Sequence, residues 1–192
     1  PSRPPIPHRA LAGRQSILSC MRERDILLHF PYQSFTTIID LLREASMDPD
    51  VRDIKITLYR VARNSSIVNA LINAIKNGKT VTVIMEIQAR FDEKNNIHWA
   101  GVMKEEGVNV LLGIPGLKVH SKLCMITRRE QKKDVVYSVI GTGNFNENTA
   151  RLYTDHYLLT CNSKITREVA SLFQFFEMNY RHSEYKTLMV SP

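Results

Sequence analysis

The stretch GLKVHSKLCMI, residues 116–126, places a histidine and two lysines in a run that otherwise reads as a buried strand. Because strand side chains alternate between two faces, His120 and Lys122 are expected to point to the same face. A neutral imidazole there can attack phosphorus, and a neighbouring ammonium can stabilise the oxygens of the transferred group. The alternative is two polar residues at the mouth of a strand, since H-x-K is a short pattern.

A second polar segment, GTGNFN at residues 141–146, follows one hairpin later. Its glycines let backbone amides approach an anion, and Asn144 can donate a side-chain hydrogen bond. H-x-K followed by G-x-G-N is more specific than either pattern alone. Together the two segments predict an anion-binding site that contains a nucleophile.

Two arginines follow strand-like runs, Arg60 after ITLY and Arg90 after MEIQA. Ligands of α/β sheets bind outside the carboxyl ends of the parallel strands. A guanidinium fork matches phosphate oxygens, so two converging forks would clamp a phosphoryl group or a polyphosphate. For either arginine taken alone, the alternative is a surface residue at a strand end.

The elements expected to position these residues follow from hydrophobic spacing, Ser caps and terminal glycines. Residues 53–113 read as strand, helix, strand, helix, strand, which implies parallel strands with right-handed crossovers. We expect helices at 34–45, 65–79, 95–107 and 165–181, strands at 53–60, 80–90, 108–113 and 155–161, and a hairpin within 118–144. The chain is therefore predicted to form one α/β domain around a mixed, mostly parallel sheet.

The composition is that of an ordinary globular domain, with 43% hydrophobic and 23% charged residues in a chain of 192. A net charge of +7 favours an anionic partner, and three widely spaced cysteines argue against a disulfide framework or a zinc site. Residues 1–24 are Pro- and Arg-containing, so we expect an arm or linker from a preceding domain there. Residues 25–192 are expected to form the globular domain.

The two polar segments resemble the signature of the phospholipase D superfamily, H-x-K-x-x-x-x-D followed by G-[ST]-x-N. This resemblance implies a phospholipase D-like fold, with helices on both faces of the sheet, and a histidine nucleophile. The chain departs from the signature at Thr127, which stands at the aspartate position. Phosphodiesterase chemistry is therefore not implied directly.

A closer resemblance covers the chain from about Asp25 to Phe176. The blocks ILLHFPYQSF, DIKITLYR, ARFDEKNNIHWA, GLKVHSKL and GTGNFNENTARLYTDHYLLT resemble, in order, the first C-terminal catalytic domain of bacterial polyphosphate kinases. Phe30 and Gln33 depart from the family's usual HHPYDSF, and we expect them to affect the rim of the site.

The kinase resemblance implies reversible transfer of the γ-phosphate of ATP to inorganic polyphosphate through a phosphohistidine at His120. Arg60 and Arg90 match positions associated with magnesium and phosphate, and we read them as holding phosphate oxygens beside Mg²⁺, because guanidinium does not ligate a cation. Tyr153 matches a nucleotide-contacting position.

The same resemblance implies as partners ATP or ADP, polyphosphate, the remaining domains of a longer enzyme and further copies of that enzyme, with no nucleic acid. It also implies a cytoplasmic location, with peripheral contact to the inner membrane face as an option. A second domain is expected to supply another essential histidine, so residues 1–192 alone are expected to show little or no kinase activity.

Two other functions stay open on the sequence. One is a phospholipase D-type nuclease or phosphodiesterase, built by pairing two H-x-K segments in a homodimer. The other is a non-catalytic module whose arginines and lysines bind a polyanion without a covalent step.

Overall fold

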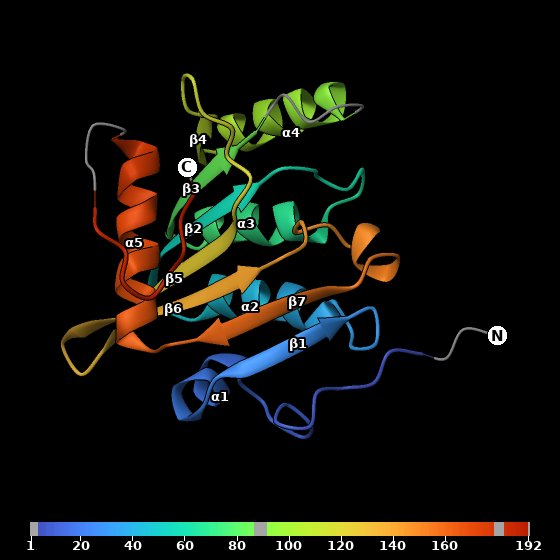
Figure 1. The fold of residues 1–192 in the computed structure, drawn as a ribbon, viewed down its shortest axis with the longest axis vertical. Coiled ribbons are helices and arrows are strands. Elements are labelled where there is room, and N and C mark those ends of the chain that lie inside the picture. The colour runs from blue at the N-terminus through green and yellow to red at the C-terminus, as the bar shows by residue number, and fades with distance from the viewer. Residues whose placement is uncertain (1–3, 87–91, 179–182, 192) are drawn as a thin grey trace.

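The computed structural model of the protein describes residues 4–86, 92–178 and 183–191. These residues build one seven-stranded sheet with the order β1-β7-β6-β5-β2-β3-β4 (Figure 1). The strands are β1 (Ile26–Phe30), β2 (Val51–Leu58), β3 (Thr80–Met85), β4 (Asn109–Leu112), β5 (Lys122–Glu130), β6 (Lys133–Gly141) and β7 (Asp155–Thr160).

Helices cover both faces of this sheet, as predicted. They are α1 (Ile17–Glu23), α2 (Thr36–Met47), α3 (Ser66–Lys76), α4 (Glu93–Glu105) and α5 (Ser163–Glu177), and the short 3₁₀ helix η1 spans Thr149–Arg151. Apolar side chains of α1 to α4 share one core cluster with one face of the sheet, and those of α5 share a second cluster with the opposite face (Figure 1). Within the described ranges no helix has the length and apolar character of a membrane span.

We expected a mostly parallel sheet, but most of its strand pairings are antiparallel. Of the six pairings among the described strands, only β2–β3 and β3–β4 are parallel. A crossover helix separates the strands of these two pairs, whereas β5 and β6 are joined by a tight turn at Gln131 and Lys132, both with positive φ. The antiparallel β1, a short strand that periodicity does not reveal, lies at the sheet edge.

The parallel unit forms where the sequence predicts it. The Ser65 hydroxyl caps α3 by accepting a hydrogen bond from the Val68 N–H, and Gly78 follows α3 with a φ of +77°. Gly107 follows α4 with a φ of +91°, again the left-handed conformation that glycine adopts without strain. These signals delimit the β2-α3-β3-α4-β4 segment, which leads toward the H-x-K stretch.

Helix α1 lies inside the segment that we expected to be an arm. Leu18, Cys20 and Met21 of this helix are buried in the core cluster of the sheet. Its N-terminus is held by Ser16, which caps the helix, and by Glu44 of α2, whose carboxylate accepts from the Ile17 N–H at 2.7 Å. A domain boundary after residue 24 stays a prediction, although α1 packs as part of the same globular unit.

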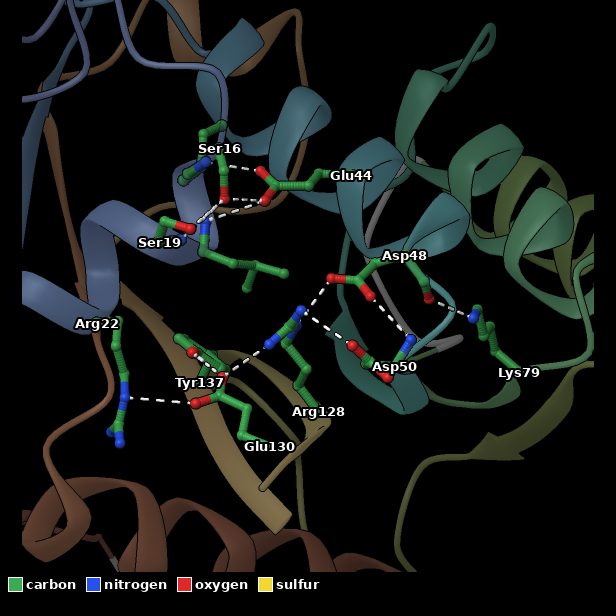
Figure 2. A network of polar contacts seen from close by, with 12 residues as sticks. Ser16, Ser19, Arg22, Glu44, Asp48, Asp50, Lys79, Arg128, Glu130 and Tyr137 are labelled. Carbon is green, nitrogen blue, oxygen red and sulfur yellow. Dashed lines mark hydrogen bonds and ion pairs between the residues drawn. The ribbon is translucent and has the colours of Figure 1, made fainter. Parts of the chain in front are cut away.

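The end of the β5–β6 hairpin is tied to the start of β2 by Arg128 (Figure 2). Its guanidinium donates to Asp48 at 2.8 Å, to Asp50 at 3.2 Å and to Glu130 at 3.2 Å. Burial would raise the pKa of the Asp48 carboxyl, but hydrogen bonds from Arg128 and from the Asp50 N–H outweigh it, so this pKa lies below its usual value. Arg128 therefore joins three acidic side chains that would otherwise repel one another.

Replacing Arg128 with Met should destabilise the fold by about 1–3 kcal/mol, because three carboxylates lose a shared donor. The loss should be largest at neutral pH and should shrink as the pH falls through the lowered pKa of Asp48, where the carboxyl takes up a proton. Urea unfolding of the two proteins at pH 7 and pH 3 measures both effects.

The control is Arg129→Met on the next position of the same strand. Among the described residues Arg129 forms an ion pair with Asp134 alone, and both side chains are about half exposed, so we expect a change within about 0.5 kcal/mol. Equal losses for the two substitutions would contradict the role assigned to the Arg128 network.

Candidate functional site

The aromatic ring of Tyr59, immediately after β2, is the centre of the candidate site. The His120 ring meets it edge to face, with 5.0 Å between the ring centroids. Lys122 Nζ lies 5.3 Å from the same centroid, and the Arg60 guanidinium carbon lies 6.0 Å from it. The structure therefore brings together three of the residues that the sequence predicts, around a tyrosine that the sequence analysis did not select.

His120 lies two residues before β5, so the expectation that it stands on the strand itself is wrong. Its segment is held instead by side chains of the neighbouring strands. The Val119 N–H donates to the Glu86 carboxylate at 3.3 Å, and the Thr57 hydroxyl donates to the Ser121 carbonyl at 2.7 Å. These contacts hold the backbone on either side of His120.

The imidazole of His120 is biased toward its neutral form. Partial burial lowers its pKa, and the positive charges of Lys122 and Lys118 lower it further. A neutral ring keeps a nitrogen lone pair, which is the electron pair that a nucleophile uses.

Lys122 is only 6% exposed although it is a lysine. Its ammonium donates to the His120 carbonyl oxygen and faces the Tyr59 ring. Burial lowers the pKa of Lys122 to about 8, while the charge of Asp155 acts in the opposite direction. The group remains mostly cationic at neutral pH and can bind an anion.

The glycines of GTGN are required by close packing. A Cβ at Gly143 would lie 2.1 Å from a carboxylate oxygen of Asp155, and one at Gly141 would lie 2.9 Å from the Tyr157 ring. The Tyr157 hydroxyl also donates to the Gly143 carbonyl at 2.6 Å.

The side chain of Asn144 has a buried oxygen without a hydrogen-bond partner among the described residues. This oxygen needs an explanation, and contact with a ligand is one.

The loop that follows GTGN is joined to the Arg60 segment. Asn146 donates to the Arg60 carbonyl at 3.2 Å, and the Glu147 carboxylate accepts from the Ser66 N–H at 2.5 Å at the start of α3. The Arg60 guanidinium pairs with Asp92 at 3.6 Å. These contacts bring the loop that contains Asn144 next to the segment that contains Arg60, at the ends of their strands.

The remaining predicted residues are less constrained. Arg90 lies outside the described residues. Tyr153 follows η1 and is 63% exposed, so its ring is free to meet a ligand. Thr127 lies on β5 with its Cα opposite that of Asp53 on β2, so the neighbouring strand places a carboxylate beside the position where the superfamily carries one.

Besides Tyr59, two further residues that contact the candidate site, Glu86 and Asn96, were not selected from the sequence. Asn96 is fully buried and hydrogen-bonds to the backbone at the ends of β2 and β3. The sequence carried no distinct signal for Asn96, because the predicted helix begins at Asn95 and asparagine at a helix start is typical of a cap.

The described residues do not form a metal centre by themselves, since no group of three or more His, Cys, Asp or Glu side chains gathers among them. Mg²⁺ prefers several oxygen ligands in octahedral geometry, and it commonly takes them from substrate phosphates and water. A magnesium ion at this site would therefore need oxygen ligands from a bound substrate and from water.

The fold is that of the phospholipase D class. The chain matches the solved structure of the phospholipase D family member Nuc from Salmonella typhimurium with a TM-score of 0.62 and 14% identity, covering 80% of this chain and 93% of that one. It matches NucT from Helicobacter pylori with a TM-score of 0.60 and 16% identity, covering 80% and 95%. At such low identity these two matches show the fold alone.

Within that class, the chain belongs to the polyphosphate kinase family, as the model of polyphosphate kinase C-terminal domain 1 matches residues 16–182. It is 55% identical to the polyphosphate kinase of Escherichia coli K12 over 172 residues, which are 90% of this chain and 25% of the relative. The solved polyphosphate kinase of Porphyromonas gingivalis matches with a TM-score of 0.85 and 37% identity, over 96% of this chain and 31% of that one. The chain thus spans about a quarter of the E. coli relative.

Proposed function

We propose that this chain is the phosphoryl-transfer domain of a polyphosphate kinase, and that His120 carries the phosphate between ATP and inorganic polyphosphate. The convergence of His120, Lys122 and Arg60 on Tyr59 is the observation that supports this proposal most directly. It combines a neutral nucleophile with two cations, which is the arrangement that transfer of a charged phosphoryl group needs.

The reaction proceeds in two displacements. A ring nitrogen of His120 donates its lone pair to the γ-phosphorus of ATP, the bond to the β–γ bridging oxygen breaks, and ADP leaves with that electron pair. A terminal oxygen of polyphosphate then attacks the phosphohistidine, the N–P bond breaks, and the imidazole is regenerated. The reverse sequence makes ATP from ADP.

Lys122 and Arg60 neutralise the equatorial oxygens while the phosphoryl group moves. Asn144 helps to place the phosphate or the His120 ring. Arg90 lies outside the described residues, and its proposed role in binding phosphate oxygens rests on the family resemblance alone. Tyr153, with its exposed ring, packs on the adenine. Mg²⁺, where it accompanies ATP, would be held through phosphate oxygens and would neutralise part of their charge.

The test of this function is the chemical nature and position of the phosphorylated residue. The full-length protein that contains this chain, incubated with [γ-³²P]ATP, should acquire a label that is labile in acid and stable in base. Alkaline digestion and mass spectrometry should locate the phosphoryl group on His120. A base-labile label, or a phosphohistidine elsewhere in the protein, would refute the assignment.

Because the chain spans about a quarter of the E. coli relative, we assign the complete activity to a longer protein, with residues 25–192 as one of its domains. Its partners would be ATP or ADP, polyphosphate, the other domains and further copies of that protein. The expected result for purified residues 1–192 is folded protein by circular dichroism with no measurable ATP-dependent polyphosphate synthesis. Robust synthesis by these residues would contradict the need for other domains.

A further inference from the structure

Side chains of helix α4 form hydrogen bonds with the backbone that follows Arg60. The side-chain amide of Asn95 donates to the Val61 carbonyl at 2.7 Å, and the indole N–H of Trp99 donates to the Ala62 carbonyl at 3.0 Å. Asn96 lies between these two residues on the helix and faces the same backbone. The segment after β2 is therefore held by a row of polar side chains and not by apolar packing alone.

Asn96 is the member of this row that reaches two strands at once. Its amide nitrogen donates to the Tyr59 carbonyl at 2.8 Å and to the Glu86 carbonyl at 3.0 Å, and its oxygen accepts from the Val61 N–H at 3.3 Å. Both amide hydrogens are used and the residue is 0% exposed. Asparagine is the side chain of this size that can donate twice and accept once in one plane.

The two carbonyls that Asn96 binds belong to the residues that touch the nucleophile segment. The Tyr59 ring meets the His120 ring, and the Glu86 carboxylate accepts from the Val119 N–H next to His120. A single buried amide thus connects both supports of the reactive histidine. Loss of this amide would release Tyr59 and Glu86 together.

We propose that Asn96 is a positioning residue for phosphoryl transfer, acting on His120 through Tyr59 and Glu86. The proposal rests on the function proposed above, and it adds a residue that does not touch the substrate. A displacement of about 1 Å in a reacting group can lower a rate by about 100-fold, so a framework residue at this point has a measurable effect.

The experiment compares Asn96→Ala with Thr160→Val in the full-length protein. Thr160 is also 0% exposed, and its hydroxyl donates to Asp25 at 2.6 Å, but it lies at the end of β7 away from Gly141 and Asp155. Both substitutions remove a buried polar network and should lower Tm by comparable amounts. Only Asn96→Ala should alter the site.

Two measurements separate positioning from stability. The first is the pKa of His120, obtained from the pH dependence of its modification by diethyl pyrocarbonate, with the adduct located by mass spectrometry. Release of Tyr59 admits water to the ring, so Asn96→Ala should move this pKa upward, toward the ordinary imidazole value of about 6.5. The second is a fall in kcat of up to about 100-fold with a smaller change in the KM for ATP. Thr160→Val should match the wild type in both.

Asn96→Ser serves as a second variant if the alanine protein does not fold. Its hydroxyl is uncharged and has one donor hydrogen in place of the two that bind the Tyr59 and Glu86 carbonyls, so its effects should lie between those of the wild type and Asn96→Ala. An unchanged pKa of His120 in the folded Asn96 variants would overturn the positioning role. If the wild type transferred no phosphate, the proposed function would fall, while the pKa comparison would still decide the positioning role.

Discussion

His120→Ala should abolish acid-labile labelling of the full-length protein by [γ-³²P]ATP and should lower polyphosphate synthesis by more than about 10⁴-fold. The reason is that alanine offers no lone pair to the γ-phosphorus, so neither displacement can begin. Cations that remain around Tyr59 can bind a nucleotide but cannot accept the phosphoryl group. The measurement is labelling intensity together with the initial rate of synthesis, at equal concentrations of folded protein.

The matched control for this prediction is His98→Ala. His98 lies on α4 with an exposed side chain, and it stands two residues after the framework residue Asn96 without sharing its buried contacts. We expect labelling and synthesis close to those of the wild type. Full retention of the label in His120→Ala would eliminate His120 as the phosphate carrier, whatever the result for His98→Ala.

Lys122→Met should lower kcat/KM for phosphate transfer by about 100- to 1000-fold, as expected when one preorganised cation is lost from a transition state. Methionine preserves most of the volume of the side chain and removes its charge. Lys118→Met is the control, because Lys118 is exposed and its ammonium lies 5.8 Å from the centroid of the same Tyr59 ring. We expect less than about a tenfold loss there, since an exposed charge is screened by water and salt. Comparable losses of kcat/KM in the two variants would contradict the proposal that Lys122 stabilises the transition state.

The pH profile distinguishes the roles of His120 and Lys122. In the proposed mechanism neutral His120 is the reactive form, so activity should rise as the pH increases through its lowered pKa. Protonated Lys122 is the useful form, so activity should decline as the pH rises through about 8. The wild-type profile of kcat/KM is therefore expected to be bell-shaped, and Lys122→Met should lose the basic limb while keeping the acid limb. A basic limb that survives this substitution would contradict the assignment.

Stability should move in the opposite direction from activity in Lys122→Met. Folding lowers the pKa of Lys122 from 10.5 to about 8, which means that the folded state disfavours its protonated form. This cost is present below pH 8 and disappears as the pH rises toward 10.5. At pH 7 the methionine variant should therefore have a Tm equal to or above that of the wild type. A large fall in Tm would show that Lys122 is a structural residue.

Most of the α/β order was readable from the sequence. Residues 53–113 carry complete local signals, namely alternating apolar residues, a Ser cap and glycines after the helices, and the structure confirms the β-α-β-α-β segment there. The pairing of β1 with β7 was not readable, because a strand of five residues has too little periodicity and its partner lies at the far end of the chain. The parallel content of the sheet was overestimated because the antiparallel pairing of β2 with β5 joins strands that are remote in sequence.

The candidate site was also predicted in part from the sequence. Residue types and spacing selected His120, Lys122, Arg60 and Asn144, and the family match confirms the resemblance on which their proposed roles rest. Tyr59 and Asn96 were not selected, because each acts through contacts with segments that are remote in sequence. A tyrosine at a strand end and an asparagine in a helix carry no chemical signature by themselves.

The sequence alone thus determined the kinds of groups that are present, the order of the parallel unit and the family. The tertiary structure decided which of these groups meet, and it decided their protonation. His120 and Lys122 are two residues apart, but the lowering of their pKa values depends on exclusion of water, to which the distant Tyr59 segment contributes. Hydrophobic periodicity is a local property of the chain, whereas burial of a charge is a property of the assembled fold.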